Sequence, residues 1–148
     1  MADTALLVMD VQQGVVARVA TGAGPLLGAL AHAVDGSRSA GIPVVYVRVA
    51  FRSGAPEVSP RNRAFAAIAG SESFGEDDPA TQIHPDVAPR RGDVVVVKKR
   101  VSAFAGSDLD VVLRSLDVRS LVLAGIATSG VVLSTLRQAA DLDYELTV

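Results

Sequence analysis

The sequence predicts an α/β fold built on a buried parallel sheet, and three observations support this prediction. Short runs rich in Val and Leu recur along the chain, separated by stretches with helical spacing. Hydrophobic residues make up 49% of the chain and charged residues 20%, which is typical of a globular protein. Aromatic residues make up only 4%, so Val, Leu, Ala and Ile must form the core. A length of 148 residues predicts one domain spanning residues 1–148.

The first part of the chain has the pattern of a βαβ unit. The apolar run Ala5–Met9 predicts a first buried strand, with Asp10 at its carboxyl end. Apolar residues then recur at helical spacing from 26 to 34, and Gly41–Pro43 ends this predicted helix. Val44–Val49 follows as the second strand.

Residues 50–92 have a looser pattern with loop-like composition and one possible short helix over Arg63–Ile68. Phe51, Phe65 and Phe74 make this segment more apolar than a flexible linker. We therefore expect it to fold over the carboxyl edge of the sheet and to shape a pocket.

The third strand is predicted over Asp93–Val97, ending in Lys98, and it is expected to be buried. Ser107–Asp108 can then cap a helix that runs through Leu113. Three apolar residues of this region are expected to face the core, namely Val111, Val112 and Leu116.

A glycine turn joins the fourth strand to the next helix. Leu121–Ala124 is the predicted strand, Gly125 ends it, and Thr128 or Ser129 can cap the helix that follows. Such a turn presents backbone N–H groups at the carboxyl edge of a parallel sheet, where α/β proteins bind ligands. A fifth strand is predicted over Tyr144–Val148.

Composition excludes several classes of function. A net charge of −2 gives no general attraction for nucleic acid or anionic lipid. The absence of cysteine excludes disulfides, thiolate metal sites and thiol nucleophiles. No apolar run approaches the ~20 residues that a membrane helix needs, and no signal peptide is recognisable. We expect a soluble, cytoplasmic protein that binds a small molecule.

Asp10 and Lys98 are the strongest candidates for chemistry, because each follows a predicted buried strand. The carboxyl ends of parallel strands share one edge, so both side chains should converge with the turn at 127–131. For Asp10 alone, a helix cap is an equally good interpretation. For Lys98 alone, a solvated strand terminus is the more common one. Only their joint placement favours a functional site.

The other polar residues are weaker candidates. His32 and His84 lack the spacing of a metal site, so we expect no metal and no cofactor. Ser129 has no visible histidine base, which makes serine hydrolase chemistry improbable. Arg52 and Arg100 could neutralise an anionic substrate, although such arginines are more often surface charges.

Three segments resemble motifs of the isochorismatase-like (cysteine hydrolase) superfamily. They are residues 6–12 (LLVMDVQ), 97–104 (VKKRVSAF) and 125–131 (GIATSGV). The resemblance covers essentially the whole chain and implies a doubly wound sheet of order 3-2-1-4-5-6. It also implies a homodimer or larger homo-oligomer, and a non-proline cis peptide at Ile126–Ala127. The chain is expected to lack the family's last strand and helix.

The resemblance also implies roles for individual residues. Asp10 would be the pocket carboxylate and Lys98 the pocket amine. The expected substrate contacts are Gln12, Phe51, Arg52, Ala127, Thr128, Ser129 and Gly130.

Val131 stands where the amide-cleaving members of this family carry their nucleophilic cysteine. A valine cannot attack a carbonyl, so their thioester mechanism cannot operate. The isochorismate-cleaving branch also lacks this cysteine and uses its aspartate as a general acid, but its turn contains a histidine that this chain lacks.

Two hypotheses follow. In the first, the chain is a cysteine-less hydrolase in which Asp10 gives or takes a proton, Lys98 sets its orientation and charge, and N–H groups near 129–131 bind a developing anion. An acid role for Asp10 would need an apolar pocket that opposes the cation of Lys98. In the second, the chain is an inactive family member that binds a small molecule or a partner subunit.

Overall fold

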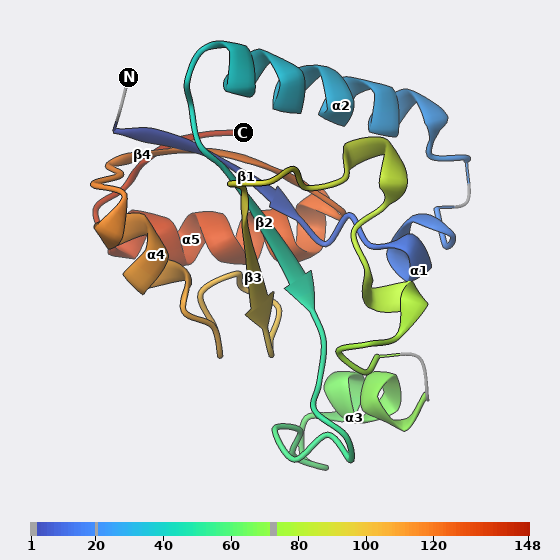
Figure 1. Cartoon of the computed structure of the whole chain (residues 1–148). Helices are drawn as coiled ribbons and strands as arrows, with labels where there is room; N and C mark the ends of the chain where they lie inside the picture. Colours follow the sequence, from blue (N-terminus) through green and yellow to red (C-terminus); the bar gives the residue numbers. More distant parts are fainter. Residues whose placement is uncertain (1–2, 20, 72–73) are drawn as a thin grey trace.

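A parallel sheet of five strands, in the order β3-β2-β1-β4-β5, forms the centre of the molecule (Figure 1). The computed structural model describes residues 3–19, 21–71 and 74–148. Its strands and helices are β1 (Thr4–Met9), α1 (Gln13–Val16), α2 (Gly24–Ser39), β2 (Val44–Val49), α3 (Arg63–Gly70), β3 (Val94–Lys98), α4 (Leu109–Ser115), β4 (Ser120–Gly125), α5 (Leu133–Asp141) and β5 (Glu145–Thr147). A π-helical turn, Thr128–Val132, leads directly into α5. The predicted fold class and strand order are confirmed.

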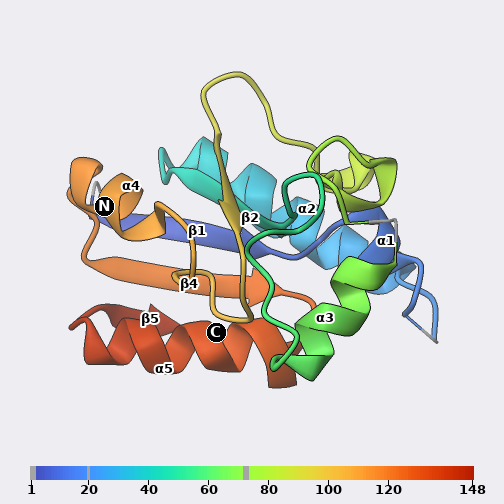
Figure 2. The same cartoon turned by 90° about the horizontal axis from the view of Figure 1, so that it is seen from below.

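Helices cover both faces of the sheet, and the alternation of side chains along β1 explains why (Figures 1 and 2). Leu6 and Val8 point to one face, where they pack in a cluster with α2. Leu7 and Met9 point to the other face and pack in a cluster with α4 and α5. Since every β1 residue from 5 to 9 is buried, β1 is the axis of the core.

The segment between β2 and β3 folds back on the residues that follow β1, at the carboxyl end of the sheet. Gln12 forms an antiparallel bridge with Ile83, and Phe51 forms a parallel bridge with Gly75. Phe51 also contacts Phe65 of α3 edge to face, with ring centroids 6.1 Å apart. Figure 1 shows α3 beyond the arrowhead of β2, so this apolar segment covers the carboxyl edge as predicted.

Three expectations about local structure are wrong. β3 is less buried than expected, because it lies at the edge where the predicted order places it, and Val95 is 42% exposed. In α4, Leu109 and Leu113 are buried one turn apart, so Val111 on the other side is 69% exposed. Thr128 and Ser129 do not cap a helix, because the helical turn already begins at Thr128.

Three further expectations concern β3, the residue after α4 and the turn after β4. The four-valine run remains a strand because it pairs with β2 along its whole length, from Val94 to Lys98. Leu116, expected to face the core, is 36% exposed just after α4. The cis peptide Ile126–Ala127 is confirmed.

No helix among the described residues combines the length and the apolar composition that crossing a bilayer requires.

The sheet is tightly paired at Gly125 and Met9, which are register partners on β4 and β1. A Cβ atom on Gly125 would lie 2.2 Å from the carbonyl oxygen of Met9 and 3.0 Å from its carbonyl carbon. Both atoms belong to the backbone of the central strand β1, so moving Met9 aside would cost a large amount of free energy. A glycine is therefore required at this position.

We expect Gly125→Ala to lower the free energy of unfolding by about 3 kcal/mol, because β1 and β4 must separate to admit the methyl group. Urea denaturation measures this loss. Gly130→Ala is the matched control, since a Cβ at Gly130 meets nothing within 4 Å. Equal stability of the two variants would contradict the close approach.

Candidate active site

Asp10 lies where the strand order reverses, between β1 and β4, at the carboxyl edge of the sheet. Its backbone adopts the left-handed conformation, with φ of 58°, and its N–H donates to the carbonyl oxygen of Val47. This conformation is rare for residues other than glycine, although Asp tolerates it better than most. It breaks the alternation of the strand and sets the direction of the Asp10 side chain.

Lys98 reaches Asp10 from the end of the edge strand β3. Its Nζ donates to Oδ2 of Asp10 at 2.9 Å and to the carbonyl oxygen of Val101 at 2.6 Å. The Lys98 side chain is only 2% exposed and that of Asp10 13% exposed. The structure therefore brings these two predicted residues together, as a buried pair. Asp10 is therefore not a helix cap, and Lys98 is not a solvated strand terminus, although these were the alternatives for each residue taken alone.

The second carboxyl oxygen of Asp10, Oδ1, is buried and has no hydrogen-bond partner among the described residues. A buried polar atom without a partner is uncommon in proteins, because it costs free energy. Oδ1 is therefore an unsatisfied acceptor beside the Lys98–Asp10 pair.

Burial raises the pKa of Asp10 to about 6, because the low-dielectric surroundings disfavour the carboxylate. The cation of Lys98 and its hydrogen bond act in the opposite direction, but their effect is smaller. Burial also lowers the pKa of Lys98, against the effect of Asp10. The apolar surroundings needed for an acid role of Asp10 are thus present.

Val131 lies in the π-helical turn and is 3% exposed, within the core cluster that also contains Met9 and Ala103. In the same turn, the N–H groups of Gly130 and Val132 both donate to the carbonyl oxygen of Ala127. The Gly130 N–H is therefore already used, although it was among the groups expected to bind an anion.

The side chain of Gln12 hydrogen-bonds to the backbone of two other segments. It is fully buried, its Nε2 donates to the carbonyl oxygens of Val49 and Thr81, and its Oε1 accepts from the N–H of Val49. Because both ends of its carboxamide are engaged, Gln12 joins β2 and the 50–92 segment to the end of β1. The expected contact of Gln12 with a substrate stays a prediction.

The remaining predicted contacts separate into two places. Phe51 and Arg52 line a hollow of about 460 Å³ beside Phe74, where Arg52 is exposed and paired with Glu57 at 3.0 Å. Ala127 and Thr128 line another hollow, of about 530 Å³, next to the cis peptide. Ser129 is exposed in the same turn, and Gly130 is half-buried.

Sequence reasoning missed the other residues around the hollow at the cis peptide, which include Val15, Arg18 and Leu26. They lie in α1, just after it and in α2. No motif marks them, and only their place in three dimensions relates them to the turn.

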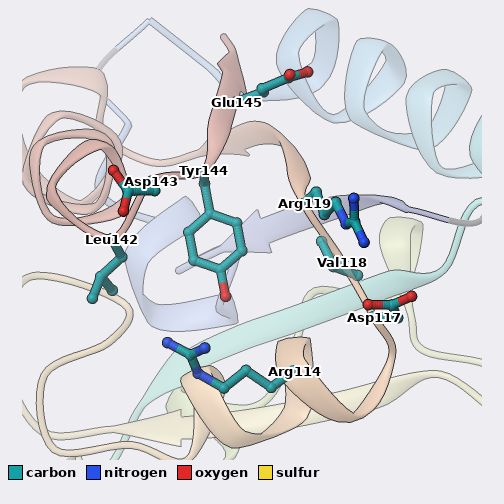
Figure 3. Close-up of a pocket in the computed structure, with 8 residues that line it drawn as sticks. All are labelled: Arg114, Asp117, Val118, Arg119, Leu142, Asp143, Tyr144 and Glu145. Atoms are coloured by element: carbon teal, nitrogen blue, oxygen red, sulfur yellow. The ribbon is translucent and has the colours of Figure 1, made fainter.

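A further hollow, of about 500 Å³, lies at the opposite end of the sheet, between the C-terminal end of α4 and the starts of β4 and β5 (Figure 3). Arg114, Arg119 and Tyr144 line it together with Asp117, Asp143 and Glu145. No residue predicted for the site lies there. Positive and negative groups alternate around this hollow, which favours no charge class of ligand.

Comparisons with known proteins agree with this geometry. The sequence model of the Isochorismatase domain matches residues 4–148. The isochorismatase family protein YwoC of Bacillus subtilis is 34% identical over 142 residues, which cover 96% of this chain and 72% of YwoC. The ureidoacrylate amidohydrolase RutB of Pseudomonas syringae is 31% identical over 164 residues, which cover 96% of this chain and 66% of RutB. The chain thus spans just under two thirds of the length of that amidohydrolase.

Solved structures give the same result. An isochorismatase family protein from Desulfovibrio vulgaris superposes with a TM-score of 0.86 at 27% identity, covering 97% of this chain and 77% of that one. N-carbamoylsarcosine amidase from Thermoplasma acidophilum superposes with a TM-score of 0.79 at 29% identity, covering 97% of this chain and 79% of that one.

We expect Lys98→Met to raise the pKa of Asp10 above about 6, because it removes the cation that favours the carboxylate. A carboxyl-carbon NMR titration measures this pKa. Lys99→Met is the matched control: the ammonium group of Lys99 donates to Ala50 and Glu76 instead, so the pKa of Asp10 should not change. An unchanged Asp10 pKa in Lys98→Met would contradict the coupling.

Proposed function

Because the chain belongs to the isochorismatase family, we propose that it is a hydrolase of small molecules in which Asp10 donates the proton and water is the nucleophile. One observation carries the proposal: a buried carboxyl group with a pKa of about 6 and an unpartnered oxygen, held by Lys98 at the switch point of the sheet. A carboxylic acid that remains partly protonated near neutral pH is suited to general acid catalysis.

The bond cleaved should be one whose rupture depends on protonation. Amides yield readily to a strong nucleophile, and the chain has no thiol to supply one. An enol ether needs a proton above all, which Asp10 can give. The proton adds to the terminal carbon of the double bond, and water adds at the resulting oxocarbenium carbon to give a hemiketal. The hemiketal then becomes a ketone as its hydroxyl proton passes to the departing oxygen, so the net change is the addition of one water across the bond. Asp10 regains its proton from the attacking water.

Lys98 acts through Asp10. Its ammonium group stabilises the carboxylate that remains after the proton has been given, and its hydrogen bond at 2.9 Å fixes which oxygen faces away from it. Oδ1, the oxygen without a partner, is then the one directed to the substrate.

A second candidate function is binding without catalysis. The observation that favours it is Val131, which is 3% exposed and packed in the core at the place of the family's nucleophile. A family member that has filled this place with a core side chain would keep the fold for binding a small molecule or another subunit. A homodimer or larger homo-oligomer and a cytoplasmic location also remain proposals.

For the acid mechanism we expect hydrolysis of isochorismate to fall as the pH rises through about 6, since Asp10 loses its proton there. Two pH units higher, about 1% of Asp10 remains protonated, and the rate should fall in proportion. Asp10→Asn should lower the rate at pH 5 by about a hundredfold or more. Asp141→Asn, an exposed change at the end of α5, is the control and should leave the rate unchanged. A rate that rises through pH 6 would identify Asp10 as a base.

Val131→Cys separates the two candidate functions. We expect this variant to gain slow hydrolysis of ureidoacrylate that depends on Asp10, because the thiol would stand at the position of the family's nucleophile. Val132→Cys is the matched control, since Val132 is also 3% exposed and adjacent, and it should gain nothing. Gain of activity by Val131→Cys together with an inactive native chain would favour the binding function. No gain in either variant would contradict an otherwise intact site.

A further inference from the structure

A groove at the carboxyl edge of the sheet lies beside the cis peptide. It has a volume of about 530 Å³, and three parts of the chain form it: α1 with the residues after it, the start of α2, and the turn after β4. We call it the turn groove. Its lining residues are Val15, Arg18, Val19, Leu26, Gly125, Ile126, Ala127 and Thr128.

The turn groove is adjacent to the segments that hold Asp10. Gly125, at one end of its lining, is the register partner of Met9, the residue that precedes Asp10. Ile126 donates its N–H to the carbonyl oxygen of Met9 at 3.1 Å. α1 begins three residues after Asp10, and Figure 1 shows it beyond the arrowhead of β1. The turn groove is therefore lined by residues that pair with the backbone of Met9, next to Asp10 in the chain.

Most of the lining is apolar, and Arg18 is its one charged residue. Leu26 is 37% exposed and contributes its aliphatic side chain to the lining. Aliphatic side chains from two helices and the turn thus form a surface suited to an apolar body.

Arg18 is held in place without a carboxylate partner among the described residues. Its guanidinium carbon lies 5.8 Å from the centroid of the Phe74 ring, in a cation–π contact that spans from the end of α1 to the 50–92 segment. A cation–π contact does not require the N–H donors of the guanidinium group, which can donate two parallel hydrogen bonds to an anion.

We propose that the turn groove binds a small carboxylate with an apolar body, and that Arg18 pairs with its carboxylate group. The assignment of this molecule as the substrate rests on the proposed function of Asp10, whereas its binding does not. Arg18 is then a residue that determines specificity, and the preferred substrates are apolar organic acids.

Benzoate and benzamide test the proposal, because they share one ring and differ in charge. Titration of the native chain with each, followed by methyl NMR shifts, gives the two affinities and identifies the contacted residues. We expect benzoate to bind about tenfold more tightly than benzamide, with shifts at Val15, Leu26 and Ile126. Arg18→Met should weaken benzoate by about tenfold and leave benzamide unchanged. Arg137→Met, at an exposed position of α5, is the matched control and should change neither.

Several outcomes would overturn the proposal. The first two are equal affinity for benzoate in the native chain and in Arg18→Met, and NMR shifts confined to residues outside the turn groove. The third is no binding of benzoate at millimolar concentration. The fourth is binding of inorganic phosphate as tight as that of benzoate. The last would indicate a site for anions alone.

The test also separates this proposal from the proposed function. Asp10→Asn should still bind benzoate through Arg18. Binding of benzoate by a native chain that does not hydrolyse isochorismate would support the turn groove and contradict the acid mechanism. Hydrolysis at the same rate in the native chain and in Arg18→Met would support the acid mechanism and contradict a role of Arg18 in substrate binding.

Discussion

The close pairing of β1 with β4 is the constraint on which the rest of the site depends. Because Gly125 has no side chain, the backbone of β4 can approach the carbonyl group of Met9, and the two strands end at the same level. Asp10 leaves one strand there, and the cis peptide turn leaves the other. A candidate carboxyl group, the place of the family's nucleophile and the turn groove are thus fixed by one backbone contact.

Burial determines the chemistry that this arrangement can support. An exposed Asp10 beside a lysine would have a lowered pKa and would be suited only to accept a proton. Here desolvation outweighs the cation, so the pKa rises to about 6 and an acid role becomes possible. One oxygen of the buried pair also has no hydrogen-bond partner among the described residues, an arrangement that is uncommon for a buried polar atom. Because valine at position 131 cannot attack a carbonyl, the thioester mechanism cannot operate. The raised pKa of Asp10 favours general acid catalysis instead.

The candidate site could be found from the sequence only in part. Asp10 and Lys98 follow predicted strands and Val131 is identified by the resemblance to the family, and the parallel topology predicts that they meet at one edge. Gln12 belongs to the same motif as Asp10, and its carboxamide hydrogen-bonds to the backbone of β2. Arg18 and Leu26 belong to no motif, so the turn groove emerges only when α1, α2 and the turn are placed together.

By itself, the sequence determined the order of strands and helices, the resemblance to the family and the absence of a thiol nucleophile, because apolar periodicity and residue identity are local properties. The tertiary structure decided that Val95 of β3 is exposed, that Lys98 is buried and that the carboxyl group of Asp10 is hard to ionise. These depend on which distant segments exclude water from a group, and desolvation is a property of the assembled surroundings.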